Sequence, residues 1–214
     1  MTEAEWMASS DSGAMLESIR TKVSNRKLKF FAAACFQRLK HLLPDSRLQQ
    51  VIELMDADPE SIELRRSAVQ RVRRALPASD DSFGGKCAGK DDPYFLSLML
   101  YRELVSSSTA HHATFATHGL ADHIGEQEQQ SRLLRCLLGP LAFHQISVPP
   151  SWLTPKVITI AQSIYDNKSF EQLPNLADAL EELDGNDARM LDHCRGDQLH
   201  ARGCWVVDLL LGKS

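Results

Sequence analysis

One segment of the chain combines residue types that could bind a metal ion. Two histidines and two cysteines lie within twelve residues, "HCRGDQLHARGC", at positions His193, Cys194, His200 and Cys204. Imidazole nitrogens and thiolate sulfurs are ligands that zinc readily accepts in proteins. His200 and Cys204 are four residues apart, so both could chelate one ion from a single helical turn. The segment is therefore a candidate zinc site.

The ligand set of this candidate site is incomplete within the segment. His193 or Cys194 could join the pair across a turn at Gly196, and His41 could come from a helix near the N-terminus. However, structural zinc sites commonly use cysteine pairs two to four residues apart, and the segment has no such pair. Gly203 would also loosen the chelating turn. These features argue against a metal, and we expect no cofactor.

The same segment can also be explained as the approach to a last, buried helix. Four apolar residues recur with the spacing of one helical face, and Cys204 would pack beside them as a small buried side chain. They are Trp205, Val206, Leu209 and Leu210. No nucleophile signature surrounds Cys194 or Cys204, so we assign no catalytic residue. The pattern favours the buried helix over the metal site.

Helical periodicity dominates the elements that would position this segment. Ser24 precedes "NRKLKFFAAACFQRLKHLL", in which apolar residues follow one stripe and charged residues lie opposite. Thr154 and Pro155 have the types expected at a helix start, as do Thr2 and Glu5. No alternating segments joined by a tight turn indicate a sheet. The sequence predicts an all-α fold, a multi-helix bundle.

The chain is long enough for one helical domain over residues 1–214. Residues 1–76 carry the N-terminal helices, 94–145 the middle helices and 150–214 a C-terminal helical block. Between the N-terminal and the middle helices, residues 77–93 are rich in Gly, Ser and Asp and are predicted to be a flexible loop. Within it, Gly84, Gly89 and Lys90 approach the phosphate-loop pattern, but Asp91 replaces the required Ser or Thr, so we expect no nucleotide.

The composition of the chain argues against several classes of protein. Hydrophobic residues make up 43% and charged residues 24% of the chain, with a formal net charge of −4, so neither disorder nor a general attraction to anionic partners is expected. No apolar run reaches the roughly 20 residues of a membrane span. The N-terminus lacks the pattern of a signal peptide. We therefore expect a cytoplasmic protein with reduced cysteines and no membrane partner.

Several stretches resemble a large paralogous family of planctomycete proteins to which no activity has been assigned. They are "TEAEW", "RKLKFFAAACFQRLKHLL", "WLTPKVITIAQSIYD", "LPNLADALEEL" and "LDHCRGDQLHARGCWVVDLLLGK", at roughly residues 1–45 and 150–213. The resemblance implies that the N- and C-terminal helices pack in one core and that the middle is a variable insert. The positions that match the recurring motif are His41, His193, Cys194, His200, Cys204 and Trp205. Residues 181–185 read "EELDG" where members often read "EEAGC", so no extra cysteine is expected.

Three functional hypotheses follow, in decreasing order of support. The first is a non-enzymatic interaction module that binds another protein through a helical surface. The second is a small metal-binding protein or hydrolase that uses the histidines and cysteines of residues 193–204, with His41 as a further ligand. The third is nucleic-acid association through the arginine-rich helix at 65–74, "RRSAVQRVRR", which has no interleaved aromatic residues to stack on bases.

Overall fold

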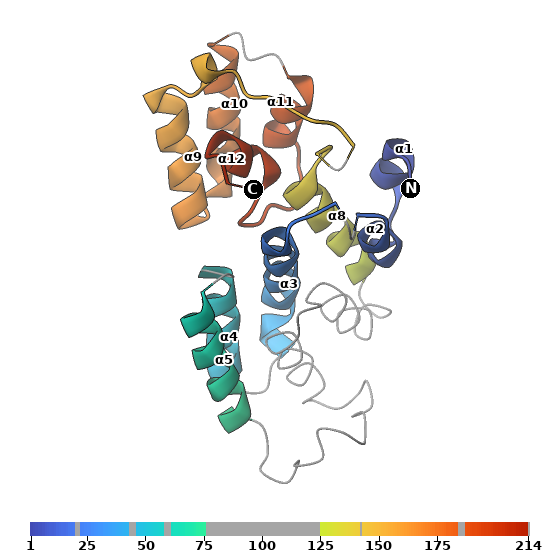
Figure 1. Cartoon of the computed structure of the whole chain (residues 1–214), viewed down its shortest axis with the longest axis vertical. Helices are drawn as coiled ribbons and strands as arrows, with labels where there is room; N and C mark the ends of the chain where they lie inside the picture. Colours follow the sequence, from blue (N-terminus) through green and yellow to red (C-terminus); the bar gives the residue numbers. More distant parts are fainter. Residues whose placement is uncertain are drawn as a thin grey trace.

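The computed structural model describes residues 1–19, 22–42, 46–57, 61–75, 125–141, 143–183 and 187–213. Every regular element in these ranges is helical, which confirms the all-α multi-helix fold. The α-helices are α1 (Glu3–Ala8), α2 (Ser12–Ile19), α3 (Asn25–Leu39), α4 (Ser46–Ala57), α5 (Ile62–Ala75), α8 (Glu126–Leu138), α9 (Pro155–Asn167), α10 (Leu173–Glu181), α11 (Ala188–Arg195) and α12 (Trp205–Leu210) (Figure 1). Short 3-10 turns occur at Lys40–Leu42, Pro150–Trp152 and Phe170–Gln172.

Local signals in the sequence set several helix boundaries. Thr2 and Glu5 form a capping box at α1, and the Ser24 hydroxyl accepts a hydrogen bond from the Lys27 amide at the start of α3. Thr154 caps α9, whose first residue is Pro155. Side-chain oxygens of this kind satisfy amides that have no partner within the helix. The predicted starts of these helices are therefore confirmed.

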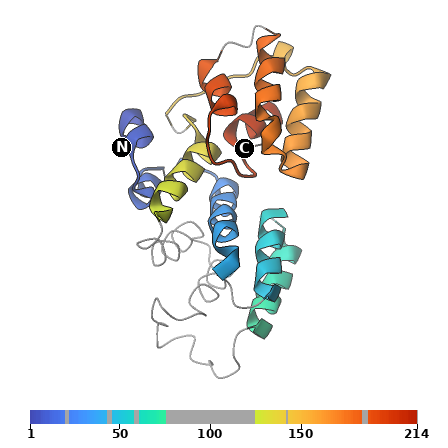
Figure 2. The same ribbon diagram turned by 180° about the vertical axis from the view of Figure 1, so that it is seen from behind.

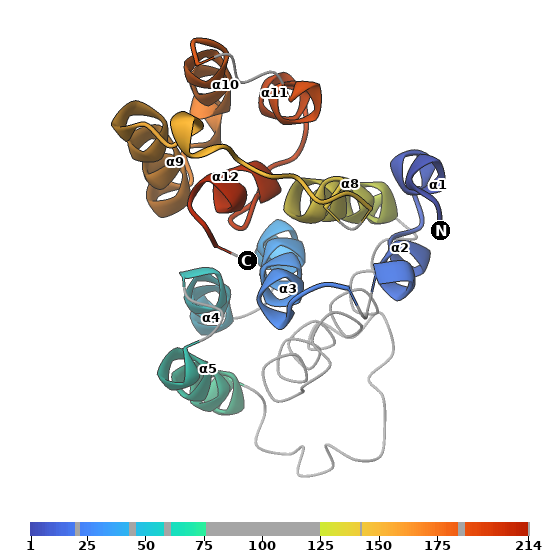
Figure 3. The ribbon, with the colours of Figure 1, turned by 45° about the horizontal axis from the view of Figure 1, so that its top comes forward.

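Helix α8 lies at the centre of the described structure (Figure 3). It packs against α2 and α3 on one side and against α12 on the other, while α9, α10 and α11 surround α12. Helices α4 and α5 pack against each other and α4 packs on α3, away from α10 and α11, as the view from behind also shows (Figure 2). The N- and C-terminal helices therefore meet on α8.

The buried apolar side chains form two main clusters. The N-terminal cluster comprises Trp6, Met15, Leu16, Ile19, Phe30, Phe31, Cys35, Leu133, Leu134, Leu137 and Leu138. The C-terminal cluster comprises Cys136, Ile146, Val157, Ala161, Ile164, Leu173, Leu176, Ala177, Ala179, Leu180, Met190, Cys194, Cys204, Trp205, Val206, Val207 and Leu210. Helix α8 contributes to both, with Cys136 facing the C-terminal one. Burial of this apolar surface is the main force that holds the helices together.

Some expectations fall outside the described residues or change in detail. The loop predicted at 77–93 and most of the middle segment, 94–124, lie outside the described ranges. The last helix begins at Trp205, after its N-cap residue Cys204, because Gly203 has a φ of 87°, in the left-handed region that lies outside a helix. Among the described helices, none is long and apolar enough to cross a membrane.

Candidate metal centre

Four side chains that can ligate a metal converge between α8, α11 and α12. One ligand atom from each of Cys136, His193, His200 and Cys204 lies within 4.8 Å of each of the others. Cys136, His193 and Cys204 are buried, and His200 is half-buried. Two thiols and two imidazoles make a Cys2His2 set, a common set of ligands for structural zinc. The sequence is compatible with such a site, and the fold assembles it.

Separate elements deliver the four ligands. Cys136 lies in the last turn of α8 and His193 in the last turn of α11, while His200 belongs to the irregular stretch after Gly196. Cys204 is the N-cap residue of α12. The chain can make the tight bend before Cys204 because Gly203 adopts a positive φ. A side chain would not fit at this position, because a Cβ there would lie 2.7 Å from Phe30 Cδ2.

The distances between the ligand atoms agree with a tetrahedral site. His193 Nε2 lies 3.1 Å from Cys204 Sγ, and Cys136 Sγ lies 3.6 Å from His200 Nδ1. With Zn–N near 2.0–2.1 Å and Zn–S near 2.3 Å, ligand atoms of a tetrahedral centre are separated by about 3.3–3.8 Å. The atoms are therefore spaced so that one ion could bind all four after small side-chain shifts.

Neighbouring aromatic rings fix the orientation of both histidines. The imidazole of His193 lies edge-on to that of His200 at a centroid distance of 5.0 Å, and 5.5 Å from the ring of Trp205. His200 in turn stacks on Phe170 at 6.0 Å. Ligands whose rotamers are fixed by packing lose less conformational entropy when a metal binds.

The two sulfurs of the set have different proton affinities. Burial is the largest influence on Cys204 and raises its pKa, but the hydrogen bond with Cys136 and the charge of His193 outweigh it, so this pKa lies well below its usual value. Burial raises the pKa of Cys136 well above its usual value, and the Cys204 partner adds to the effect. Cys204 is therefore the sulfur of the pair that loses its proton more readily, and the thiolate is the form of cysteine that binds metals.

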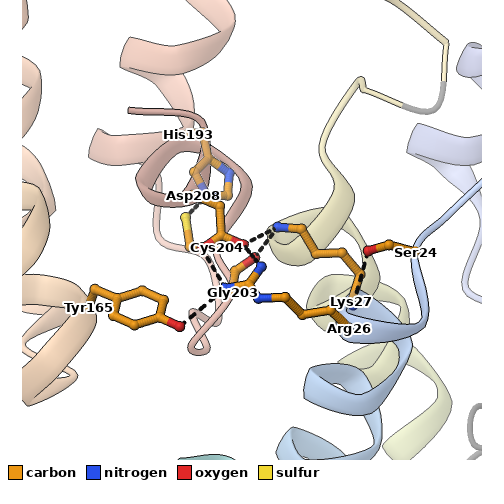
Figure 4. A network of polar contacts seen from close by, with 8 residues as sticks. All are labelled: Ser24, Arg26, Lys27, Tyr165, His193, Gly203, Cys204 and Asp208. Carbon is orange, nitrogen blue, oxygen red and sulfur yellow. Dashed lines mark hydrogen bonds and ion pairs between the residues drawn. The ribbon is translucent and has the colours of Figure 1, made fainter. Parts of the chain in front are cut away.

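A buried network of ion pairs holds the backbone around Cys204 (Figure 4). Asp208 Oδ2 accepts hydrogen bonds from Lys27 Nζ and from an Arg26 guanidinium nitrogen, both at 2.6 Å. Lys27 Nζ also donates to the Gly203 carbonyl oxygen at 2.6 Å. A second Arg26 nitrogen, Nη2, donates to the Tyr165 hydroxyl at 3.1 Å and to Asp208 Oδ1 at 3.3 Å. Helix α3 is thereby attached to the residue directly before the Cys204 ligand.

This network places two cations around a single carboxylate. Burial lowers the pKa of Lys27, although the charge of Asp208 opposes the effect. The negative field of the Cys204 thiolate also stabilises the Lys27 ammonium. A buried charge is tolerated only when it is paired and hydrogen-bonded. The thiolate therefore helps to balance the excess positive charge of Arg26 and Lys27.

The structure brings together some, but not all, of the residues that the sequence suggested as ligands. It brings together His193, His200 and Cys204 but leaves out Cys194, which packs in the C-terminal cluster and whose pKa is raised by burial. His41 is also outside the group; it is exposed, and its Nδ1 lies 3.1 Å from the Arg38 carbonyl oxygen. Adjacent residues of a helix point about 100° apart, so His193 and Cys194 cannot both face the site.

Sequence reasoning missed the fourth ligand, Cys136. This residue lies 57 positions before His193, within "RLLRCLLG", where it looks like one more small side chain on a buried helix face. No local spacing marks it as a ligand. The only available signal was that a three-residue Cys/His set needs a fourth partner, which could be any of the remaining cysteines and histidines.

The arginine-rich helix α5 does not form a comparable site. Arg66, Arg71 and Arg74 are exposed, and Arg71 donates to the Gln50 side chain at 2.8 Å. The side chains of Arg65 and Arg73, and residues 84–91 with the phosphate-loop-like pattern, are outside the described part of the chain. Exposed arginines on one helix are typical of a solvated surface.

Comparisons with protein-family models, with curated proteins and with solved structures find no match for this chain. Its fold and its Cys2His2 cluster are therefore interpreted from their own geometry. In that geometry, four protein ligands would fill a tetrahedral centre and leave no position for water or substrate. The arrangement suits a metal that holds the fold together better than one that activates a substrate.

Proposed function

We propose that the chain is a zinc-binding helical protein in which Cys136, His193, His200 and Cys204 hold one structural Zn²⁺. The ion would join the end of α8, the end of α11 and the start of α12. The observation that carries the proposal is the convergence of four nitrogen and sulfur ligand atoms within 4.8 Å of one another in a largely buried site. A thiolate and two imidazoles are costly to bury without partners, and a metal ion would satisfy them all.

The proposed centre favours a structural role over hydrolysis. Catalytic zinc sites keep an open position for water, whereas this set supplies four protein ligands. The interaction module expected from the sequence stays a prediction, for which the zinc centre would provide a rigid scaffold. Membership of the planctomycete family and a cytoplasmic location are also retained as proposals, the latter because thiolate ligands persist in a reducing compartment.

Metal analysis of the purified, untagged chain tests the proposal. Mass spectrometry should find about one zinc per chain in the wild type. The double variant His200→Ala/Cys204→Ala should lose it. The matched control Cys194→Ala removes a neighbouring buried thiol that is not part of the four-ligand group, and it should retain the metal. A wild-type chain that takes up no zinc during refolding with the ion would contradict the proposal.

A further inference from the structure

The two sulfurs of the candidate centre also form a potential redox pair. Cys136 and Cys204 come from separate helices that pack directly on each other, and their Sγ atoms lie within 4.8 Å. Their side chains are close enough to share a hydrogen bond. Only a small movement would bring two such sulfurs to the roughly 2.05 Å of a disulfide.

Two histidines lie between the buried sulfurs and the surface of the protein. A partly open cavity of about 210 Å³ lies between α1 and α11, and His193 and Trp205 form part of its wall. His200, the other histidine of the cluster, is half-buried. Both histidines contact the sulfurs directly. The site is therefore closed to large reagents but lies one side chain away from solvent.

We propose that a hydroperoxide converts Cys136 and Cys204 to a disulfide and thereby expels the metal. The inference rests on the proposed zinc centre and adds that oxidation regulates zinc binding there. Cys204 is the attacking sulfur, because His193 Nε2 lies 3.1 Å from it and the Lys27 ammonium is held beside it on the Gly203 carbonyl. A cysteine sulfur that binds zinc is a thiolate, the nucleophilic form.

The chemistry balances in two steps. With hydrogen peroxide, the Cys204 thiolate attacks one peroxide oxygen, an S–O bond forms and the O–O bond breaks. The leaving hydroxide takes a proton from solvent to become water, and sulfur loses two electrons to give a sulfenic acid. The Cys136 sulfur, a thiolate while it binds zinc, then attacks the Cys204 sulfur. An S–S bond forms, the S–O bond breaks, and the leaving hydroxide takes a proton from solvent to become a second water. The peroxide is reduced by two electrons in total.

Oxidation would remove both thiolate ligands and leave only His193 and His200. Two imidazoles alone hold zinc far less tightly than a complete set of four ligands. The disulfide would still join α8 to α12, so that contact persists. His200 and the stretch after Gly196 would lose their anchor. The switch therefore releases one segment and keeps the central helices together.

The test uses the full chain loaded with one zinc. Hydrogen peroxide is added in steps, a chromogenic chelator reports free zinc, and peptide mapping reports the state of each cysteine. Zinc release and the loss of two of the five thiols should proceed at the same rate, with a mass decrease of about 2 Da and a Cys136–Cys204 peptide. A dithiol reductant should restore zinc binding. Cys194→Ala should behave as the wild type.

The possible failures are distinguishable. Zinc that stays bound, with Cys136 and Cys204 still reduced under excess peroxide, would overturn the redox inference and leave the zinc centre intact. Zinc loss accompanied by sulfinic acid on Cys204, without a cross-link, would overturn it as well. A chain with no zinc before oxidant is added would contradict the proposed function itself and remove the basis of the switch.

Discussion

The N-terminal and C-terminal clusters are held together in different ways. The N-terminal cluster consists of apolar side chains from regular helices, with polar pairs such as Arg38–Glu126 and Ser12–Gln130 at α8. The C-terminal cluster contains Cys204, the last residue of an irregular stretch, residues 196–204, whose backbone forms no helix and whose Leu199 and Ala201 pack against the N-terminal cluster. Regular helices satisfy their own backbone and need only packing. The irregular stretch instead depends on side-chain ligands and the Lys27–Asp208 network.

Chelation of the metal should lower the stability of the protein more than any other change. It should also affect the C-terminal cluster more than the N-terminal cluster. Zinc binding to a structural site contributes several kcal/mol to folding, so its removal should lower Tm by more than about 10 °C. Hydrogen exchange should show loss of protection in α11 and α12, while amides of α3 remain protected. Equal loss of protection in both clusters would contradict the distinction between them.

Asp208→Asn should be the next most damaging change. It removes the carboxylate between Arg26 and Lys27 and leaves two buried cations without their partner, which should cost about 3–5 kcal/mol in urea unfolding. The matched control is Asp178→Asn, an exposed carboxylate paired with Arg195, expected to cost less than about 1 kcal/mol. Similar losses for both variants would show that the Asp208 network is not required.

Two glycines with positive φ allow a sharper test of packing at the junction of the clusters. At Gly139, a Cβ would lie 2.5 Å from Trp205 Nε1, so Gly139→Ala combines backbone strain with overpacking and should cost about 2–4 kcal/mol. At Gly212 nothing lies within 4 Å, and Gly212→Ala should cost about 1 kcal/mol from strain alone. Chemical denaturation of both variants measures the difference between their free energies of unfolding. This difference should vanish if the Trp205 side chain can move away from the new methyl group.

The smallest effect is expected at the surface. Arg195 pairs with Asp178 and Glu181, all exposed, so Arg195→Ala should change the free energy of unfolding by less than about 1 kcal/mol and leave the zinc content unchanged. Arg38→Ala should cost more, about 1–3 kcal/mol, because its partner Glu126 is almost fully buried. A larger loss at Arg195 would mean that α11 depends on its surface pairs.

Much of the local structure could be predicted from the sequence, but only part of the site. The caps at Thr2, Ser24 and Thr154 are short-range signals, and the structure confirms them. His193, His200 and Cys204 were found because they lie in one segment. Cys136 was missed because its spatial neighbours are distant in sequence and its own surroundings look apolar. Side-chain direction, which excludes Cys194, depends on packing.

The attachment of α3 to the last described helix also has a consequence for folding kinetics. Lys27 and Asp208 are 181 residues apart in sequence, so their ion pair closes a very long loop. Helical proteins with mainly local contacts fold in about microseconds to milliseconds, and long-range contacts slow this because loop-closure entropy is lost first. We therefore expect the contact between the start of α3 and the segment after Gly203 to form late in folding, after α3 has already packed on α8.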